Sequence, residues 1–428
     1  MSSSVSWFGK VPEHWTVTRT KFLFSRMQRP VEADDEVVTA FRDGQVTLRK
    51  NRRIDGFTNS EKEIGYQGVR KGDLVVHAMD AFAGAIGIAE ADGKSTPVYS
   101  VCTPLAADVH TPFFAKLLRH MALSGYVESL GRGVRERSTE FRWADLSEVE
   151  LPVPPLIEQE RIANFLDDKT ARIDALIAEK ERLVERLSEL RYSTVSWAVT
   201  GGLYSNKGAC KTGHPFVPEL PIGWQLGGLT KYIGPVVDYR GKTPEKVDEG
   251  VLLVTARNIR DGLLDYSASA EYVRESDYEE VMRRGRPEIG DVLFTTEAPL
   301  GQVANVDRTD IALAQRVVKF RGLAGVINNY FLKYWLMGAA VQATLTTLAT
   351  GSTAEGIKAS KFGQIPVAVP SFTEQAEIVA FLDARRDAFD AVSDHLQEHI
   401  DRLREYRSSL ISAAVTGQLD ISTFKEAA

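Results

Sequence analysis

The feature that most constrains this chain is a long segment that occurs twice. Residues 154–203 align without a gap on residues 370–419, at an offset of 216 positions. Glu158-Gln159 falls on Glu374-Gln375, and the Ala-Val-Thr-Gly that ends the first copy at Gly201 recurs in the second. A repeat with a fixed period decides the fold and has to be recognised first. We therefore interpret the 428-residue chain as a duplication with a period of about half its length.

Both copies have the pattern of a long helix. Residues recur at alternating spacings of four and three, and an average spacing of 3.5 is the seam of a left-handed coiled coil. Pro155 and Pro370 stand just before the two runs, whereas Gly201 and Gly417 stand just past them. About 40 residues at ~1.5 Å each give a rod of roughly 60 Å. The simplest pairing joins the two copies; the alternative is two unrelated core helices. The apolar members of the predicted seam are Ile162, Leu166, Ile173, Leu176, Leu183, Leu187, Leu190, Ile378, Leu382, Phe389, Val392, Leu396, Leu403 and Leu410.

The length and composition fit two or three domains with substantial cores. No run of about 18 apolar residues occurs and the N-terminus lacks an apolar signal region, so we expect a cytoplasmic protein. Cys102 and Cys210 define neither a disulfide framework nor a metal site. The formal charge of −6 argues weakly against a nucleic-acid binder, but local basic faces are compatible with it.

Each half also contains a globular segment with common punctuation. A Pro-x-x-Trp entry ends at Trp15 and again at Trp224. Gly-Asp turns lead into strands near residues 74–76 and 292–294, and second strands follow near 85–89 and 302–306. Helices are expected from Thr111-Pro112 and from Asn328 or Asn329, with Thr-Pro and Asn-Asn as N-caps. Strands near 149–153 and 365–369 close the segments. The predicted fold is α+β: two mixed α/β domains at 1–153 and 219–369, long helices at 154–200 and 370–416, an irregular linker at 201–218 and a tail at 417–428.

Catalytic signatures are missing. The sequence has no Gly-x4-Gly-Lys-Ser/Thr loop, no Gly-x-Ser-x-Gly elbow and no Asn/Asp-Pro-Pro-aromatic tetrapeptide of amino methyltransferases. The seven histidines are scattered, and only His395 and His399 have helical i,i+4 spacing. We therefore expect no metal site and no catalysis by the chain itself.

Basic and polar loops are the remaining candidate chemistry. Arginine can hold guanine through two hydrogen bonds, and lysine, serine or threonine can hold phosphate. The alternative is that these residues only keep each domain soluble. The candidate DNA-binding residues are Arg49, Lys50, Arg52, Arg53, Arg132, Arg135, Arg137, Arg240, Lys242, Thr243, Arg257, Asn258, Ser352, Thr353, Lys358 and Lys361.

These residues resemble a known family. Three runs are similar to the specificity subunits of type I restriction–modification systems. They are Pro-Pro-Leu-Ile-Glu-Gln-Glu-Arg-Ile at 154–162, Ile-Asp-Ala-Leu-Ile-Ala-Glu-Lys-Glu-Arg-Leu at 173–183 and Ala-Val-Thr-Gly-Gly-Leu at 198–203. Four segments of the second half look like features of the target-recognition domains of this family: residues 240–244, 257–259, 290–293 and 351–358. The loop that begins at Gly131 departs from the family's Gly-Ser-Thr form.

The resemblance implies two target-recognition domains, related by pseudo-twofold symmetry and separated by an antiparallel pair of long helices. Each domain would read one half of a split sequence in double-stranded DNA, and the helices would fix the spacer. Two methyltransferase subunits and two motor–nuclease subunits would dock on the chain. S-adenosylmethionine, ATP and Mg²⁺ would be bound by these partners, and this chain would bind no cofactor.

Two other functions stay open at this point. The chain could be a structural adaptor whose coiled coil and α/β domains bind proteins, or an enzyme with an unrecognised active site. Binding to duplex DNA that weakens steeply with salt would favour the DNA reader.

Overall fold

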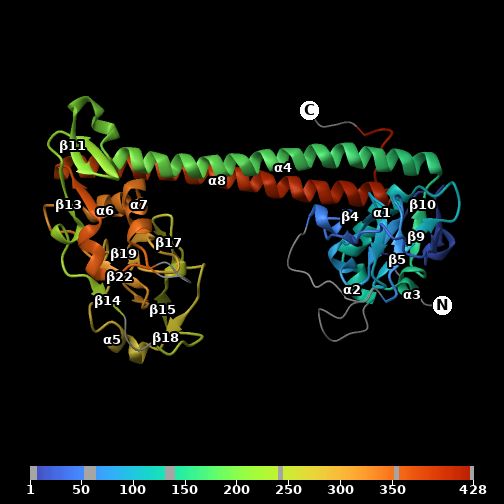
Figure 1. Cartoon of the computed structure of the whole chain (residues 1–428), viewed down its shortest axis with the longest axis horizontal. Helices are drawn as coiled ribbons and strands as arrows, with labels where there is room; N and C mark the ends of the chain where they lie inside the picture. Colours follow the sequence, from blue (N-terminus) through green and yellow to red (C-terminus); the bar gives the residue numbers. More distant parts are fainter. Residues whose placement is uncertain (1–6, 53–63, 131–139, 240–243, 351–355, 425–428) are drawn as a thin grey trace. The chain divides into compact units, whose positions relative to one another are not determined.

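The structure is a computed structural model that describes residues 7–52, 64–130, 140–239, 244–350 and 356–424 (Figure 1). The chain divides into two compact units. Unit 1 comprises residues 1–180 and 398–428, and unit 2 comprises residues 181–397. Among the described residues, no helix combines the length and apolarity needed to cross a membrane.

Unit 1 is built on an antiparallel four-stranded sheet with the order β2-β9-β6-β7. Helix α1 (Thr111–Leu123) buries Phe113, Phe114, Leu117, Leu118 and Met121, which are the residues that the sequence places on its apolar side. The strands of unit 1 are β1 (Thr16–Arg19), β2 (Phe24–Arg26), β3 (Val38–Ala40), β4 (Val46–Leu48), β5 (Gln67–Val69), β6 (Leu74–His77), β7 (Ile86–Ile88), β8 (Gly93–Ser95), β9 (Tyr99–Pro104) and β10 (Glu150–Val153); its short helices are α2 (Tyr126–Leu130) and α3 (Trp143–Leu146).

Unit 2 has a four-stranded sheet in the corresponding order β14-β22-β19-β20, and a second sheet in the order β18-β15-β21. Its strands are β11 (Ala209–His214), β12 (Val217–Pro221), β13 (Gln225–Gly228), β14 (Val237–Asp238), β15 (Val251–Val254), β16 (Ile259–Arg260), β17 (Leu263–Leu264), β18 (Tyr272–Val273), β19 (Val292–Thr295), β20 (Val303–Asn305), β21 (Ile311–Leu313), β22 (Val317–Phe320) and β23 (Pro366–Val369). Its shorter helices are α5 (Tyr278–Val281), α6 (Asn329–Met337) and α7 (Ala339–Leu348).

The Gly-Asp turns lead into β6 and β19, as the sequence predicts, and each turn encloses a buried carboxylate. Asp73 accepts a hydrogen bond from the backbone N–H of Arg70 at 2.7 Å, and its side chain is 4 % exposed. Asp291 accepts one from the N–H of Glu288 at 2.9 Å and also pairs with Lys319 at 2.9 Å. Because a buried carboxylate needs hydrogen-bond donors or a cationic partner, the aspartates of these turns are explained by folding alone.

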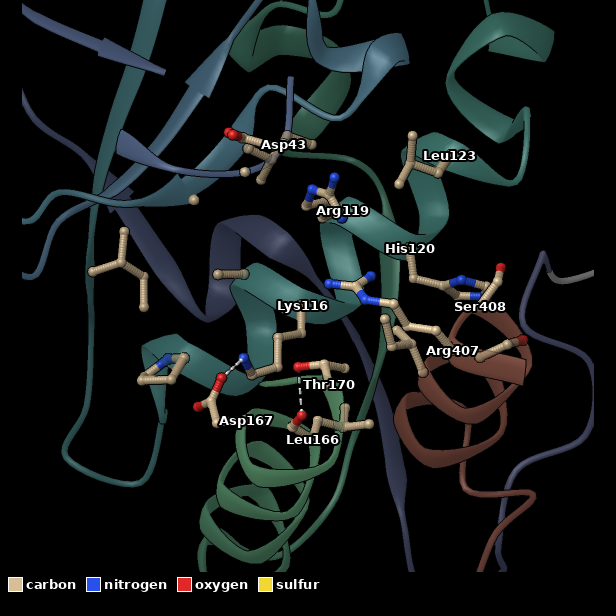
Figure 2. Close-up of a pocket in the computed structure, with 18 of the residues that line it drawn as sticks. Asp43, Lys116, Arg119, His120, Leu123, Leu166, Asp167, Thr170, Arg407 and Ser408 are labelled. Atoms are coloured by element: carbon tan, nitrogen blue, oxygen red, sulfur yellow. Dashed lines mark hydrogen bonds and ion pairs between the residues drawn. The ribbon is translucent and has the colours of Figure 1, made fainter. Parts of the chain in front are cut away.

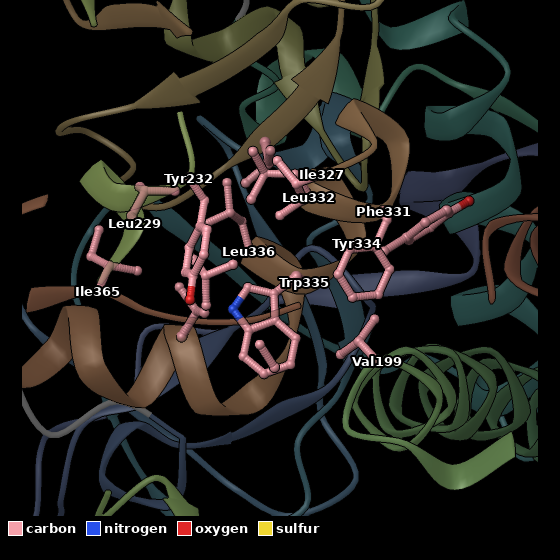
Figure 3. Packing of buried hydrophobic residues seen from close by; sticks show 14 of the residues in the cluster. Val199, Leu229, Tyr232, Ile327, Phe331, Leu332, Tyr334, Trp335, Leu336 and Ile365 are labelled. Atoms are coloured by element: carbon pink, nitrogen blue, oxygen red, sulfur yellow. The ribbon is translucent and has the colours of Figure 1, made fainter. Parts of the chain in front are cut away.

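The core of unit 2 gathers around α6 (Figure 3). Phe331, Leu332, Trp335 and Leu336 are all at most 1 % exposed, and Val199 from the end of α4 packs against the same cluster. The indole Nε1 of Trp335 donates to the carbonyl of Pro366 at 2.7 Å, so this large side chain is buried without an unsatisfied polar atom.

The repeated segments form the two longest helices, α4 (Leu156–Val199) and α8 (Phe372–Val415), each of 44 residues. A glutamine in the first turn anchors each of them. The amide of Gln159 accepts from the N–H of His110, the residue that precedes α1, and the amide of Gln375 accepts from the N–H of Asn328, the residue that precedes α6. The Glu-Gln pair of the repeat therefore ties the start of each long helix to the start of a domain helix.

In both units α4 lies beside α8 in the antiparallel sense. In unit 1 Asp174 pairs with Arg407, and in unit 2 Asp390 pairs with Arg191, so an early part of one helix meets a late part of the other. The two ion pairs are related by the repeat offset of 216 residues.

The buried face of the helices differs from the predicted seam at four of its fourteen apolar residues. Ile162, Leu166, Ile173, Ile378, Leu382 and Leu410 are buried, and Leu187, Phe389, Leu396 and Leu403 are partly buried. In contrast, Leu176, Leu183, Leu190 and Val392 are between 43 % and 53 % exposed. Ile177 and Ile400 are buried instead, and each follows a position of the predicted heptad register, Leu176 and His399 respectively. The heptad spacing predicted that leucines such as Leu176 are buried, whereas in the structure a neighbouring isoleucine such as Ile177 is buried.

Two further predictions need correction. The segment 201–218 is not irregular: it contains a short 3-10 helix and the β11–β12 hairpin, whose Val217 and Leu220 are buried in the core of unit 2. Thr111 is the first residue of α1 and not its N-cap; the N-cap is His110, whose side chain makes no capping bond. Asn328 does cap α6, accepting from the N–H groups of Tyr330 and Phe331.

Candidate nucleic-acid interface

The described candidates of unit 1 follow β4 on a single 3-10 turn. Nε of Arg49 donates to the hydroxyl of Thr39 at 3.3 Å, and Lys50 pairs with Glu36. Arg52 pairs with Asp43 at 2.6 Å and lies over the ring of Phe41 at 4.3 Å. These cations are therefore held in position by the hairpin β3–β4, and Lys50 remains 60 % exposed.

In unit 2, the adjacent candidates Arg257 and Asn258 have opposite environments. The side chain of Arg257 is exposed and has no partner within the described ranges. Asn258 is fully buried: its Oδ1 accepts from Thr255, and its Nδ2 donates to the carbonyls of Asp265 and Ser269 at 2.9 Å each. Because every polar atom of its amide is already used, Asn258 shapes the loop, and Arg257 is the residue that the loop presents.

The two described lysines of the second half also differ. Lys358 is exposed, whereas Nζ of Lys361 donates to the carbonyl of Leu348 at 2.8 Å and so closes the end of α7. The other candidates lie outside the described residues: Arg53, Arg132, Arg135, Arg137, Arg240, Lys242, Thr243, Ser352 and Thr353.

A cavity in unit 1 was missed by the sequence interpretation (Figure 2). It has a volume of about 1310 Å³ and lies among the β3–β4 turn, α1, the first part of α4 and the last part of α8. Arg119 of α1 and Arg407 of α8 both line it, and Lys116 pairs with Asp167 at its edge. Five lysines and arginines line it, against three carboxylates.

The guanidinium groups of Arg119 and Arg407 have different partners. Arg407 donates to Asp174 at 3.0 Å. Arg119 has no carboxylate partner in the described part of the chain: its Nε and Nη2 donate to the carbonyls of Gly84 and Arg42 at 3.2 and 3.1 Å. Burial and the nearby charge of Arg407 lower the pKa of Arg119, and burial lowers the pKa of the neighbouring His120. Arg119 is therefore a cavity cation that no described carboxylate bonds directly, while the charges of Asp43 and Asp174 act on it from nearby.

The corresponding place in unit 2 is nearly filled. Tyr334 donates to Asp383 at 2.6 Å, where unit 1 has Lys116 and Asp167. Three residues further along each helix, Met337 takes the place of Arg119. The remaining space has a volume of about 10 Å³. The sequence interpretation did not mark this difference, because it considered only the apolar side of α1, and Arg119 lies outside that set.

Across the described residues, no cluster of three His, Cys, Asp or Glu side chains has the arrangement of a metal site. The exposed apolar surface of unit 2 is more informative. Leu190 and Trp197 of α4, with Phe381 and Phe389 of α8, line a shallow groove of about 530 Å³. Leu190 and Trp197 are 53 % and 49 % exposed.

Comparisons with known proteins agree with the resemblance seen in the sequence. Residues 277–402 match the family model described as Type I restriction modification DNA specificity domain. The chain is 22% identical over 327 residues to the Type I restriction enzyme EcoBI specificity subunit of Escherichia coli, covering 73% of this chain and 67% of that protein. It is 21% identical over 439 residues to the Type I restriction enzyme EcoKI specificity subunit of Escherichia coli (strain K12), covering 96% and 90%.

The fold also has a solved relative. A structure described as the structural basis underlying complex assembly and conformational transition of the type I R-M system superposes with a TM-score of 0.66 at 16% identity. The match covers 96% of this chain and all of that one. The mixed α/β architecture with two long helices is therefore that of a known fold.

Proposed function

We propose that this chain, a relative of type I restriction–modification specificity subunits in sequence and fold, is the DNA-reading subunit of such a complex. The observation that carries the proposal is the match of the whole architecture, 96% of the chain, to a chain from a type I system. The chain would be non-catalytic and act in the cytoplasm. Partner subunits would bind S-adenosylmethionine, ATP and Mg²⁺ and carry out methylation and cleavage.

Each unit would contain one target-recognition domain that reads one half of a bipartite site in double-stranded DNA. The corresponding strand orders of the two four-stranded sheets support this duplication. Equivalent contacts in the two copies support it as well. Gln159 and Gln375 each accept from the residue before a domain helix, and Asp174 and Asp390 each pair with an arginine of the other long helix. We propose a pseudo-twofold relation between the halves on this basis, with domain boundaries near 1–153 and 219–369.

The long helices would set the distance between the half-sites. At ~1.5 Å per residue, 44 residues give a helix of roughly 66 Å. Half-sites read from one face of B-DNA lie about one turn apart, ~34–36 Å, so helices of this length leave room for both the spacer and the docking of partners.

The outward-facing apolar residues of the helices support partner docking. Large exposed apolar groups in a contiguous patch commonly mark protein interfaces. In unit 2 Leu190, Trp197, Phe381 and Phe389 form such a patch. We propose that the two methyltransferase subunits, and with them the two motor–nuclease subunits, assemble on the helices through surfaces of this kind.

A genome-wide map of methylated bases tests the proposed function. Cells that supply the partner methyltransferase are compared with and without this chain. We expect methylation at a split motif, two short half-sites around a fixed gap, only when the chain is present. Absence of any dependent motif, despite a verified complex, would favour an adaptor that binds proteins.

The variant Arg257→Ala sharpens the same experiment. Because Arg257 is exposed and unpaired in the described chain, its loss should relax one half-site and leave the other intact; a lost two-bond contact to a base costs ~1–3 kcal/mol. Arg308→Ala is the matched control, since Arg308 is an exposed arginine of the same unit already paired with Asp310. Equal effects of both variants would argue against base reading by Arg257.

A further inference from the structure

The cavity of unit 1 has the character of a binding site for an anion. Two of the side chains that line it, Arg119 and Arg407, come from different elements, α1 and α8 (Figure 2), and the charge of Arg407 acts on Arg119. Like charges held together in a partly buried place repel each other unless an anion lies between them. Arg407 already has Asp174 as a partner, whereas Arg119 is bonded only to two neutral carbonyl groups in the described structure.

The donors that remain free suit a tetrahedral oxyanion. Nη1 of Arg119 and Nη1 of Arg407 have no acceptor among the described residues. Hydroxyl groups of Ser408 and Ser412 on α8 lie on the same wall. A planar carboxylate is satisfied by one arginine fork, whereas a phosphate offers oxygens in several directions to donors on opposite walls.

The second unit shows that the fold does not require this cavity. Where Arg119 stands in unit 1, unit 2 has the apolar Met337, and where unit 1 has the small Thr170, unit 2 has Arg386. With these larger or apolar groups in place only about 10 Å³ remains, against about 1310 Å³. A cationic cavity that the same scaffold can fill with side chains is a feature specific to unit 1.

We propose that this cavity binds a phosphate group, held between Arg119 and Arg407. The phosphate could belong to the DNA backbone or to a small phosphorylated ligand. The two sources share one chemistry, and only the DNA source rests on the proposed function.

The first arm of the test uses a small anion. Inorganic pyrophosphate is titrated into the full chain and followed by calorimetry. We expect binding at one site per chain, at least tenfold weaker in Arg119→Met, the variant that introduces the residue of unit 2. Circular dichroism verifies the folding of each variant.

The second arm uses DNA. The affinity of the full chain with its methyltransferase partner for a duplex is measured at several salt concentrations. If a backbone phosphate is the ligand, Arg119→Met should reduce the slope of log K against log salt by about one. A reduced slope without pyrophosphate binding assigns the phosphate to DNA, and pyrophosphate binding with an unchanged slope assigns it to a small ligand.

Matched helix variants separate anion binding from stability. Arg407→Gln removes a cavity cation and its ion pair with Asp174, whereas Arg191→Gln removes the corresponding pair with Asp390 and a bond to the carbonyl of Asp261 in the filled unit. We expect Arg407→Gln to weaken anion binding at least tenfold and Arg191→Gln to leave it unchanged. Equal losses in these two variants, or no effect of Arg119→Met in either arm, would overturn the proposal. Neither result depends on whether a split methylation motif is found.

Discussion

The junction of α1 with the long helices in unit 1 and the junction of α6 with them in unit 2 use the same contacts but differ in what fills them. Both have a side chain of the domain helix bonded to an aspartate of the long helix, Lys116 to Asp167 and Tyr334 to Asp383. Unit 2 closes the remaining space, and unit 1 leaves it open. A duplicated scaffold therefore preserves its frame while single side chains decide whether a cavity exists.

A hairpin turn contributes to the difference. In unit 2 the turn at Asp261-Gly262 reaches the long helix, because the carbonyl of Asp261 accepts from Arg191 at 3.4 Å. In unit 1 the turn at Gly44 lies directly over Gly87, where a Cβ atom would be only 2.0 Å from the carbonyl oxygen of Gly44. The turn in unit 1 also touches α1, because Nη2 of Arg119 donates to the carbonyl of Arg42 at 3.1 Å.

The largest expected effect concerns the anchors at the starts of the two long helices. Trp15 donates to Glu158 at 2.9 Å in unit 1, and Trp224 donates to Glu374 at 3.4 Å in unit 2. Burial opposes ionisation of Glu374, but hydrogen bonds from Lys207, Ser371 and Trp224 outweigh it and lower the pKa from 4.5 to about 2. At ~1.4 kcal/mol per pKa unit, Glu374→Gln should cost about 3 kcal/mol at neutral pH.

The pH dependence of unfolding by urea checks this prediction. A lowered folded-state pKa stabilises the fold above pH 4.5, the usual pKa of the group, and this contribution is lost as the pH falls toward 2. The difference between wild type and Glu374→Gln should therefore shrink over that range. Glu158→Gln is the control, and because the side chain of Glu158 is 35% exposed, it should cost less than about 1 kcal/mol. Equal costs at neutral pH would show that the two anchors are equivalent.

How far the sequence predicts this structure depends on whether a residue's role follows from its neighbours along the chain. The two long helices, the Gly-Asp turns and the paired strands near 85–89 and 302–306 follow from local patterns and a repeat offset, and all of them are present. The exposed Leu176 and the buried Ile177 could not be distinguished in this way, because both are apolar and only the partner helix decides which one it covers.

The candidate site was less predictable for the same reason. Exposed arginines such as Arg257 can be proposed from loop composition alone, whereas Asn258 beside it is consumed by bonds to Asp265 and Ser269, which lie on a later part of the loop. Arg119 and Arg407 are almost 300 residues apart in sequence, and they line one cavity only because α4 contacts α8 in the antiparallel sense and α1 packs beside them.

An intermediate effect is expected from a larger residue at Gly87, which would displace the turn at Gly44. Gly87 pairs with Val75 in unit 1, at the position where Ala304 pairs with Leu293 in unit 2. Gly87→Ala should push the turn at Gly44 off the sheet, cost about 2 kcal/mol as an overpacked site and weaken pyrophosphate binding. Unfolding by urea and calorimetry measure the two consequences. The reverse change, Ala304→Gly, serves as the control and should cost about 1 kcal/mol without affecting the anion. A neutral Gly87→Ala variant would show that the turn owes its position to other contacts.

The smallest expected effect has the opposite sign and tests the filled junction. Lys333 of α6 is 4 % exposed, and no described residue accepts a hydrogen bond from its ammonium group. Burial, only partly opposed by the charge of Asp383, lowers the pKa of Lys333 from 10.5 to about 8. The unfolded chain therefore holds this proton more tightly than the folded one, so the charged lysine destabilises the fold below pH 8, and this penalty fades as the pH rises toward 10.5.

Lys333→Met should stabilise the protein by about 1 kcal/mol at pH 7 and by less at pH 10. The exposed Lys358→Met is the control and should change stability by less than about 0.5 kcal/mol. If Lys333→Met instead destabilises the protein, the ammonium group has a favourable role in unit 2, and the filled junction would then depend on charge as the open one does.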